Sequence, residues 1–86
     1  MHSVELLAEA VDAAKRIGFE VREEWFGGSG GGACRIHERK CLFLDLSLSP
    51  RERLDQALEA LDGDSDVTAI ELPPPLRRLL AVRRVA

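Results

Sequence analysis

The sequence predicts a small α+β domain, a two-layer sandwich with helices on one face of a mostly antiparallel sheet. Two segments, 3–17 and 50–62, carry apolar residues at helical spacing. Shorter segments with the apolar pattern of strands lie between and after them. The predicted order is α-β-β-β-α-β-α, and 86 residues are enough for one such domain.

The first helix is predicted over residues 3–17. Ser3 can cap its N-terminus, and the residues that follow place valine, leucine and alanine on one face. Lys15 and Arg16 suit the negative end of the helix dipole. Gly18 is typical of the left-handed position that ends a helix.

Three strands should follow, at Phe19–Trp25, Ala33–His37 and Cys41–Leu46. Between the first two lies a glycine run, 27–32, which has almost no side chains to pack and is expected to be a loop. The simplest arrangement of the three strands is an antiparallel meander, although the sequence pattern does not fix their order.

The second and third strands are predicted to form a hairpin with a three-residue loop, Glu38–Lys40. That loop pairs Ile36 with Leu42 and Cys34 with Leu44, so that all four side chains enter the core. A slip of one residue would exchange the two faces of the strand.

The second helix has a clear start, because Ser49-Pro50-Arg51-Glu52 is a capping box with proline at the first helical position. Val67–Leu72 is expected to be a fourth strand, reached by a helical crossover. Residues 73–75 are three prolines, which end that strand, and Leu76 begins a short final helix.

Charge divides the chain into an acidic part and a basic tail. The formal net charge is −3, but residues 72–86 contain four arginines and no acid. We expect a domain at 1–72, followed at 73–86 by a triproline spacer and a basic C-terminal helix that packs on the same or a neighbouring chain. The overall acidity disfavours general binding to nucleic acid or to anionic membranes.

The two cysteines are too few for a disulfide scaffold, and neither a signal peptide nor a membrane-spanning run is evident. The expected location is the cytoplasm, with reduced thiols. No cofactor or metal ion is expected.

The stretch from Trp25 to Leu46 contains most residues that could form a site. It holds five of the seven glycines, both cysteines and the only tryptophan. The candidate surface for a ligand or partner consists of Gly28, Gly30, Gly31, Gly32, Arg35, His37, Cys41 and Phe43.

A zinc site from Cys34, His37 and Cys41 is one alternative, because zinc binds thiolates and imidazoles. The three-residue hairpin loop argues against it, since Cys34 would then point into the core while the other two point outward. The same register would prevent a disulfide between the cysteines. A Cys41–His37 thiol site on the outer face is a further, weaker alternative.

The function that the sequence favours is a non-enzymatic protein-interaction domain, and a homodimer is one form of it. The predicted outer face of the sheet would expose Phe43, with Arg35, His37, Cys41 and Asp45 around it. The alternative is binding of an anion or small ligand by loop 27–32, because successive backbone N–H groups can form an anion-binding nest.

Two resemblances add to these expectations. The order α-β-β-β-α over residues 3–62 resembles that of double-stranded-RNA-binding domains, although Arg51-Glu52-Arg53 includes an acid where those domains carry a lysine-rich helix start. RNA binding is therefore a minor hypothesis. The segments G-G-G-A-C-R-I, K-C-L-F-L-D-L and S-P-R-E-R-L are faintly similar to small uncharacterised bacterial proteins, which imply no function.

Overall fold

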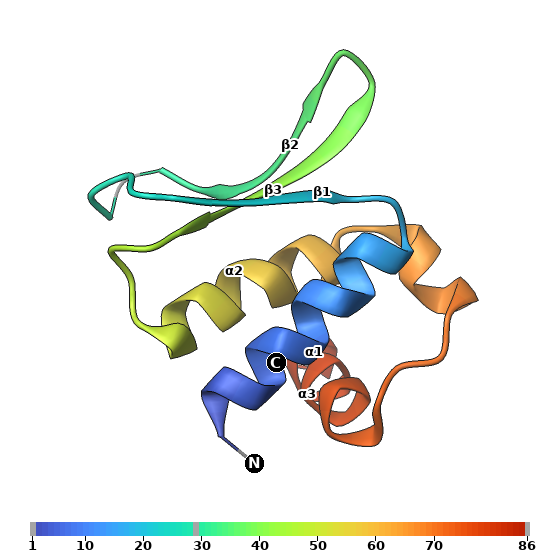
Figure 1. The fold of residues 1–86 in the computed structure, drawn as a ribbon. Coiled ribbons are helices and arrows are strands. Elements are labelled where there is room, and N and C mark those ends of the chain that lie inside the picture. Colours follow the sequence, from blue (N-terminus) through green and yellow to red (C-terminus); the bar gives the residue numbers. More distant parts are fainter. Residues whose placement is uncertain (1, 29, 86) are drawn as a thin grey trace.

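A computed structural model describes residues 2–28 and 30–85 and confirms the α+β class. The helices lie on one side of a three-stranded sheet, which gives two layers (Figure 1). The elements, in chain order, are α1 (Ser3–Arg16), β1 (Glu20–Glu24), β2 (Gly32–Ile36), β3 (Arg39–Asp45), α2 (Pro50–Asp62), the short 3-10 helix η1 (Ser65–Ala69) and α3 (Pro74–Val85).

The start of α2 and the end of α1 follow the predicted local signals. The start of α1 does not, because its N-cap is His2 and no side chain caps it, so the predicted Ser3 cap is wrong. The Ser49 hydroxyl accepts a hydrogen bond from the Glu52 amide, and the Glu52 carboxylate accepts one from the Ser49 amide, both at 3.2 Å. This reciprocal pair satisfies two amides that the start of α2 would leave without partners. At the end of α1, Gly18 adopts a φ of 100°, which turns the chain into β1.

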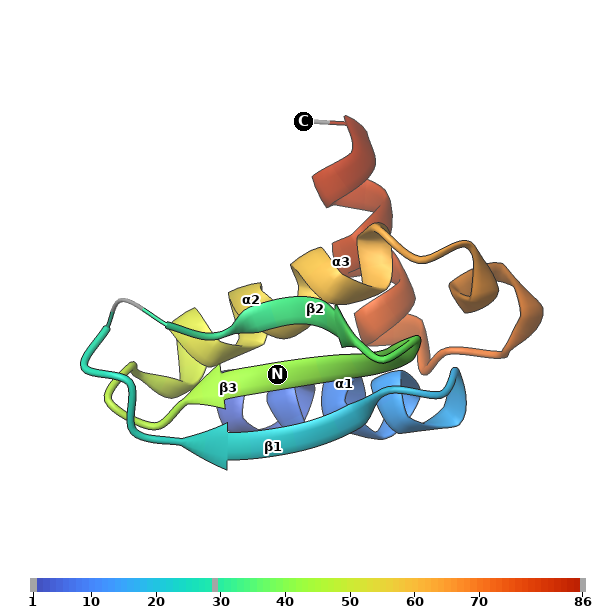
Figure 2. The ribbon, with the colours of Figure 1, turned by 90° about the horizontal axis from the view of Figure 1, so that it is seen from above.

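The sheet is mixed, so the predicted antiparallel meander is wrong. Its order is β1-β3-β2, with β1 parallel and β2 antiparallel to β3 (Figure 2). The central strand contains the apolar run Cys41–Leu44, whereas four of the five β1 residues are charged. Placing β3 in the middle buries its leucines completely and leaves the charged strand at an edge.

The hairpin joins its strands through two residues, not three. His37 and Glu38 have φ angles of 50° and 68°, as in the type I′ turns that match strand twist. Cys34 therefore pairs with Cys41, and Ile36 with Arg39. The predicted register is wrong because β2 is an edge strand, so its apolar side chains are not required to reach the core.

The segment predicted as a fourth strand, Val67–Leu72, forms η1 and an extended connection instead. Local hydrogen bonds explain the difference. The Asp64 carboxylate caps the Asp66 amide at 2.9 Å, and the Thr68 hydroxyl donates to the Ser65 carbonyl at 2.9 Å. Val67 remains buried, so the segment still contributes to the core.

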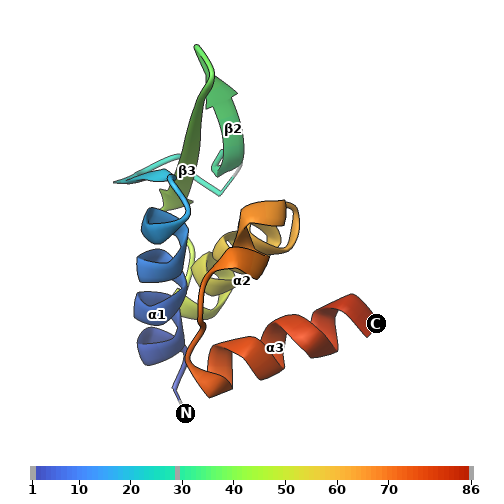
Figure 3. The same cartoon turned by 90° about the vertical axis from the view of Figure 1, so that its right-hand side faces the viewer.

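The C-terminal helix packs on its own chain. Leu76 and Leu80 of α3 are buried in the same core as α1 and α2, on the side away from the sheet (Figure 3). The Arg83 guanidinium also lies 2.7 Å from the Asp55 carboxylate on α2. The helix begins at Pro74, because proline suits the first turn of a helix.

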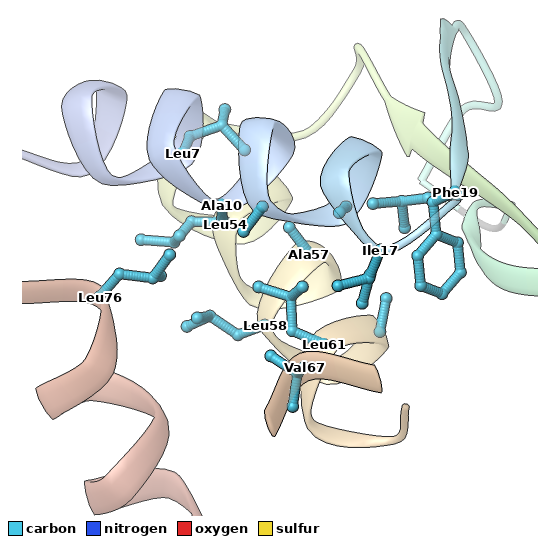
Figure 4. Close-up of a cluster of buried hydrophobic side chains, with 14 of the residues drawn as sticks. Leu7, Ala10, Ile17, Phe19, Leu54, Ala57, Leu58, Leu61, Val67 and Leu76 are labelled. Carbon is cyan, nitrogen blue, oxygen red and sulfur yellow. The ribbon is translucent and has the colours of Figure 1, made fainter. Parts of the chain in front are cut away.

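The core lies between the sheet and the helices and extends between the helices themselves (Figure 4). Ala10 on α1 and Ala57 on α2 are completely buried, and their small side chains allow these helices to pack closely. Leu42 and Leu44 close the core from the sheet side. Residues 2–28 and 30–85 include no helix with the length and apolar character that a membrane crossing requires.

The two-residue turn can be tested with Glu38→Gly. We expect this change to stabilise the domain by about 1 kcal/mol, because glycine adopts a left-handed backbone without the penalty of a β-carbon. The control is Glu24→Gly in β1, which should destabilise by roughly 0.5–1 kcal/mol. Urea unfolding measures both, and changes of the same sign would contradict the turn.

Candidate functional site

The sheet face that points away from the helices has a charged flank and an apolar centre. The register places Glu20 and Arg22 beside Cys41 and Phe43 on this outer face. The ring of Phe26, which follows β1, meets the Phe43 ring edge-on, with centroids 6.0 Å apart. Phe43 is therefore half-buried and less open than predicted.

Exposed apolar side chains lie at both ends of the sheet. Trp25, after β1, is 74% exposed, and Ile36, before the hairpin turn, is 46% exposed. Gly32 and Cys34 share the outer face with Ile36, because they pair with outer-face residues of β3. The cysteines therefore lie on one face, contrary to the sequence-based register.

Asp45, the last residue of β3, is the only charged side chain among the described residues that is completely buried. Its carboxylate accepts hydrogen bonds from the amides of Phe26 (3.1 Å), Gly28 (2.7 Å) and Ser47 (2.9 Å) and from the Ser47 hydroxyl (2.6 Å). Burial alone would raise the pKa of Asp45, but these hydrogen bonds outweigh it and lower the pKa to about 2. Asp45 is therefore a carboxylate at neutral pH, and it is enclosed rather than open on the outer face.

The glycine-rich loop is built around this carboxylate. Gly27 and Gly28 have φ angles of 70° and 88°, which let the chain turn so that the Gly28 amide faces Asp45. Gly30 lies against the Phe26 ring, where a β-carbon would come within 2.7 Å of the ring. Ser29, within the predicted loop 27–32, lies outside the described residues.

Gln56 of α2 holds the far side of the same loop. Its side-chain oxygen accepts from the Asp45 amide at 3.2 Å, and its nitrogen donates to the Gly30 carbonyl at 3.5 Å. Gly31 has a φ of 95°, and a β-carbon there would lie 3.0 Å from the Phe43 carbonyl oxygen, so this position requires glycine as well. The loop is thus fixed between β3 and α2.

A groove of about 530 Å³ lies between the free edge of β2 and α2. The groove is open because small residues line both of its walls. Gly31, Gly32 and Ala33 line the strand side, and Ala60 and Gly63 line the helix side. The remaining lining residues are Phe19, Cys34 and the charged or polar residues Arg35, Lys40, Gln56, Glu59 and Asp64.

Lys40 lines this groove but is already paired. Its ammonium group lies 3.0 Å from the Asp64 carboxylate and 3.1 Å from that of Asp66, and 5.1 Å from the centre of the Phe19 ring. Burial alone would lower the pKa of Lys40, but these hydrogen bonds and charges raise it; in turn Lys40 helps to lower the pKa of Asp64. The cluster ties the hairpin to η1.

The predicted candidate residues do not form one site. Gly32, Cys41 and Phe43 belong to the outer face, and Gly28, Gly30 and Gly31 to the loop. Arg35 pairs with Lys40 and lines the groove on the helix side, so its predicted outward position is wrong. His37 is in the hairpin turn.

The zinc alternative gains no support from the new register. Cys34 and Cys41 do share a face, but His37 lies in the turn rather than within either strand. Across the described part of the chain, no three His, Cys, Asp or Glu side chains are placed to share a metal ion. Cys41 is also only 4% exposed, which counts against the Cys41–His37 thiol site.

Sequence reasoning missed Asp45 and Gln56 as the residues that order the loop. One signal was present for Asp45, because an aspartate two residues before a serine often hydrogen-bonds the backbone in this way. Nothing in the sequence singled out Gln56, whose partners are 11 and 26 residues away.

No protein family, curated protein or solved structure gave a significant match to this chain. The two resemblances noted from the sequence therefore stay predictions.

Asp45→Asn should loosen the loop. Asparagine keeps one oxygen and has an NH2 donor in place of the other, so it leaves a donor facing either the Phe26 or the Gly28 amide, which bind different carboxylate oxygens. We expect faster hydrogen exchange at one of these amides and a lower unfolding temperature. Asp12→Asn, at an exposed position of α1, is the control and should behave as wild type. Unchanged exchange in Asp45→Asn would contradict the arrangement.

Acid should remove the stabilisation that the Asp45 carboxylate provides. The pKa of Asp45 is about 2 in the folded protein, against about 3.9 for an unfolded aspartate. The stabilisation by the carboxylate is therefore present above about pH 4 and is lost as the pH falls toward 2. The difference in free energy of unfolding between wild type and Asp45→Asn should shrink between about pH 6 and about pH 2.5. A constant difference would contradict this assignment.

Proposed function

We propose that this chain is a non-enzymatic protein-interaction domain that binds an extended peptide segment as an added strand beside β2. The observation that carries the proposal is the free edge of β2 above the groove that α2 lines. Strand addition at a sheet edge supplies main-chain hydrogen bonds, and neighbouring hollows accept alternate side chains of the peptide.

The hairpin turn determines which backbone groups face the peptide. In a two-residue hairpin the residues that flank the turn, here Ile36 and Arg39, exchange both hydrogen bonds. Pairs then alternate, so Cys34 bonds to β3 whereas Ala33 and Arg35 direct their amides and carbonyls away from it. These two residues offer two donors and two acceptors at the edge.

Little protects this edge against an added strand. Native edge strands are usually blocked by proline, a bulge or inward charges, and β2 contains neither proline nor a bulge in its five-residue pairing with β3. Its one charged residue, Arg35, faces the helix side and is the only one of these three devices that β2 carries. The small side chains of Ala33, Ala60 and Gly63 leave room for an apolar side chain of the peptide.

The position of α2 favours a peptide over a second copy at this edge. α2 runs beneath β2 and past its edge (Figure 2). Two copies joined edge to edge would place their β2 strands about 4.8 Å apart. In an antiparallel pairing, which keeps both helix layers on the same side of the joined sheet, their α2 helices would be much closer than the 8–10 Å that packed helices need. An extended peptide has no such helix.

A homodimer through the outer face is the second form of this proposal. The exposed Ile36 side chain on the outer face favours it, since large exposed apolar groups often mark contact surfaces. The partial cover of Phe43 by Phe26 weakens it. Anion binding by the glycine-rich loop is less favoured, because the Phe26 and Gly28 amides already bind Asp45.

Arg35→Pro and Arg35→Ala form a matched pair that tests the edge. Both variants remove the arginine side chain. Only Arg35→Pro also removes the backbone N–H that faces away from β3, and both variants retain the hydrogen bonds between β2 and β3. Peptides selected from a displayed random library should bind Arg35→Ala, and Arg35→Pro should bind them at least about tenfold more weakly, a loss expected from one or two hydrogen bonds. Isothermal titration measures the affinities.

Backbone chemical shifts complete this test. A selected peptide should shift the amides of Ala33 and Arg35 and those of the facing turns of α2. Equal affinity for the two variants, or shifts confined to the outer face, would contradict strand addition. Light scattering during size-exclusion chromatography tests the homodimer form, because a dimer that Ile36→Ser abolishes has its interface on the outer face.

A further inference from the structure

The two cysteines form a cross-strand pair. Cys34 and Cys41 are the chain's only cysteines, and they are direct partners in the register of β2 and β3. Directly opposite residues of an antiparallel pair extend from the same side of the sheet. Both side chains therefore lie on the outer face, which no helix covers in the described part of the chain (Figure 3).

Their spacing permits a disulfide bond. The alternation from the turn makes Cys34 and Cys41 a hydrogen-bonded pair, for which the Cα atoms lie about 5.5 Å apart. Disulfides span Cα distances of about 4.4–6.8 Å. In a disulfide, however, the two Cβ atoms are about 3.5–4.5 Å apart, which is less than the roughly 5.5 Å between the Cβ atoms of a hydrogen-bonded cross-strand pair. The bond would therefore close with some strain, which makes a disulfide easier to reduce.

Accessibility gives the two thiols different roles. Cys34 is exposed, whereas Cys41 is 4% exposed and its thiol faces the Arg39 carbonyl, with 3.9 Å between sulfur and oxygen. A reagent in solution can reach Cys34 but not Cys41. Cys41 can still reach the Cys34 sulfur, because the two side chains are neighbours.

We propose that Cys34 and Cys41 constitute a reversible dithiol site that reacts with low-molecular-weight disulfides. The Cys34 thiolate attacks one sulfur of the disulfide, its S–S bond breaks, and the first small thiol leaves with the proton that Cys34 lost. The Cys41 thiol then loses its proton and attacks the Cys34 sulfur. The second small thiol leaves with that proton, so the protein dithiol is oxidised and one small disulfide is reduced to two thiols.

Oxidised glutathione is the probe, and intact-mass spectrometry is the readout. The wild-type protein should lose the mass of two hydrogens and retain no glutathione, and reduced glutathione in excess should reverse the change. Cys41→Ala should instead accumulate one glutathione on Cys34, since no second thiol displaces it. Cys34→Ala should remain unmodified, because Cys41 is shielded.

Three results would overturn the proposal. They are a stable glutathione adduct on the wild-type protein, a disulfide between two molecules through Cys34, and modification of Cys34→Ala at the rate of Cys41→Ala. Cys41→Ser serves as a second resolving-cysteine variant if Cys41→Ala unfolds, and circular dichroism verifies that each variant is folded. The reaction does not require the peptide-binding function proposed above, so the two proposals fail separately.

Discussion

The arrangement of the sheet depends on the buried carboxylate of Asp45. β1 and β2 lie on opposite sides of β3, so the chain between them must pass the end of β3. Asp45 is that end, and its carboxylate binds the passing backbone at the Phe26 and Gly28 amides. A buried carboxylate is costly unless hydrogen bonds replace its water, and here four donors do so. The glycines allow those amides to converge on it.

This crossing also produces the proposed binding edge. Because the chain reaches β2 only after passing β3, β2 has one paired side and one free side. Gln56 links the same loop to α2, and α2 therefore lies beneath the free edge and forms the second wall of the groove. One set of hydrogen bonds thus orders the glycine-rich loop and positions both walls of the groove. The loop supports the site and is not itself the site.

The hairpin turn has a comparable influence on the outer face. A two-residue turn at His37 and Glu38 aligns Cys34 with Cys41 and turns the backbone of Ala33 and Arg35 outward. The predicted three-residue loop would have separated the cysteines and buried Cys34. The proposed dithiol and the proposed peptide edge therefore share one origin, the length of this turn. The two proposed sites meet at Cys34, because the cysteine side chains extend from the outer face while Cys34 also borders the groove on the helix side.

Local sequence signals were sufficient for the α+β class, for the helix boundaries at Ser49 and Gly18, and for the order of elements through α2, because these depend on capping and apolar periodicity. Local signals could not specify which strand lies in the middle of the sheet. They also did not show that the Asp64 cap favours a 3-10 helix over a strand at the start of Val67–Leu72. They also could not reveal the partners of Asp45 and Gln56, which are distant in sequence. These features depend on tertiary contacts. Burying the leucines of β3 and enclosing the Asp45 carboxylate bring together segments that are distant in the sequence, and no local pattern connects those segments.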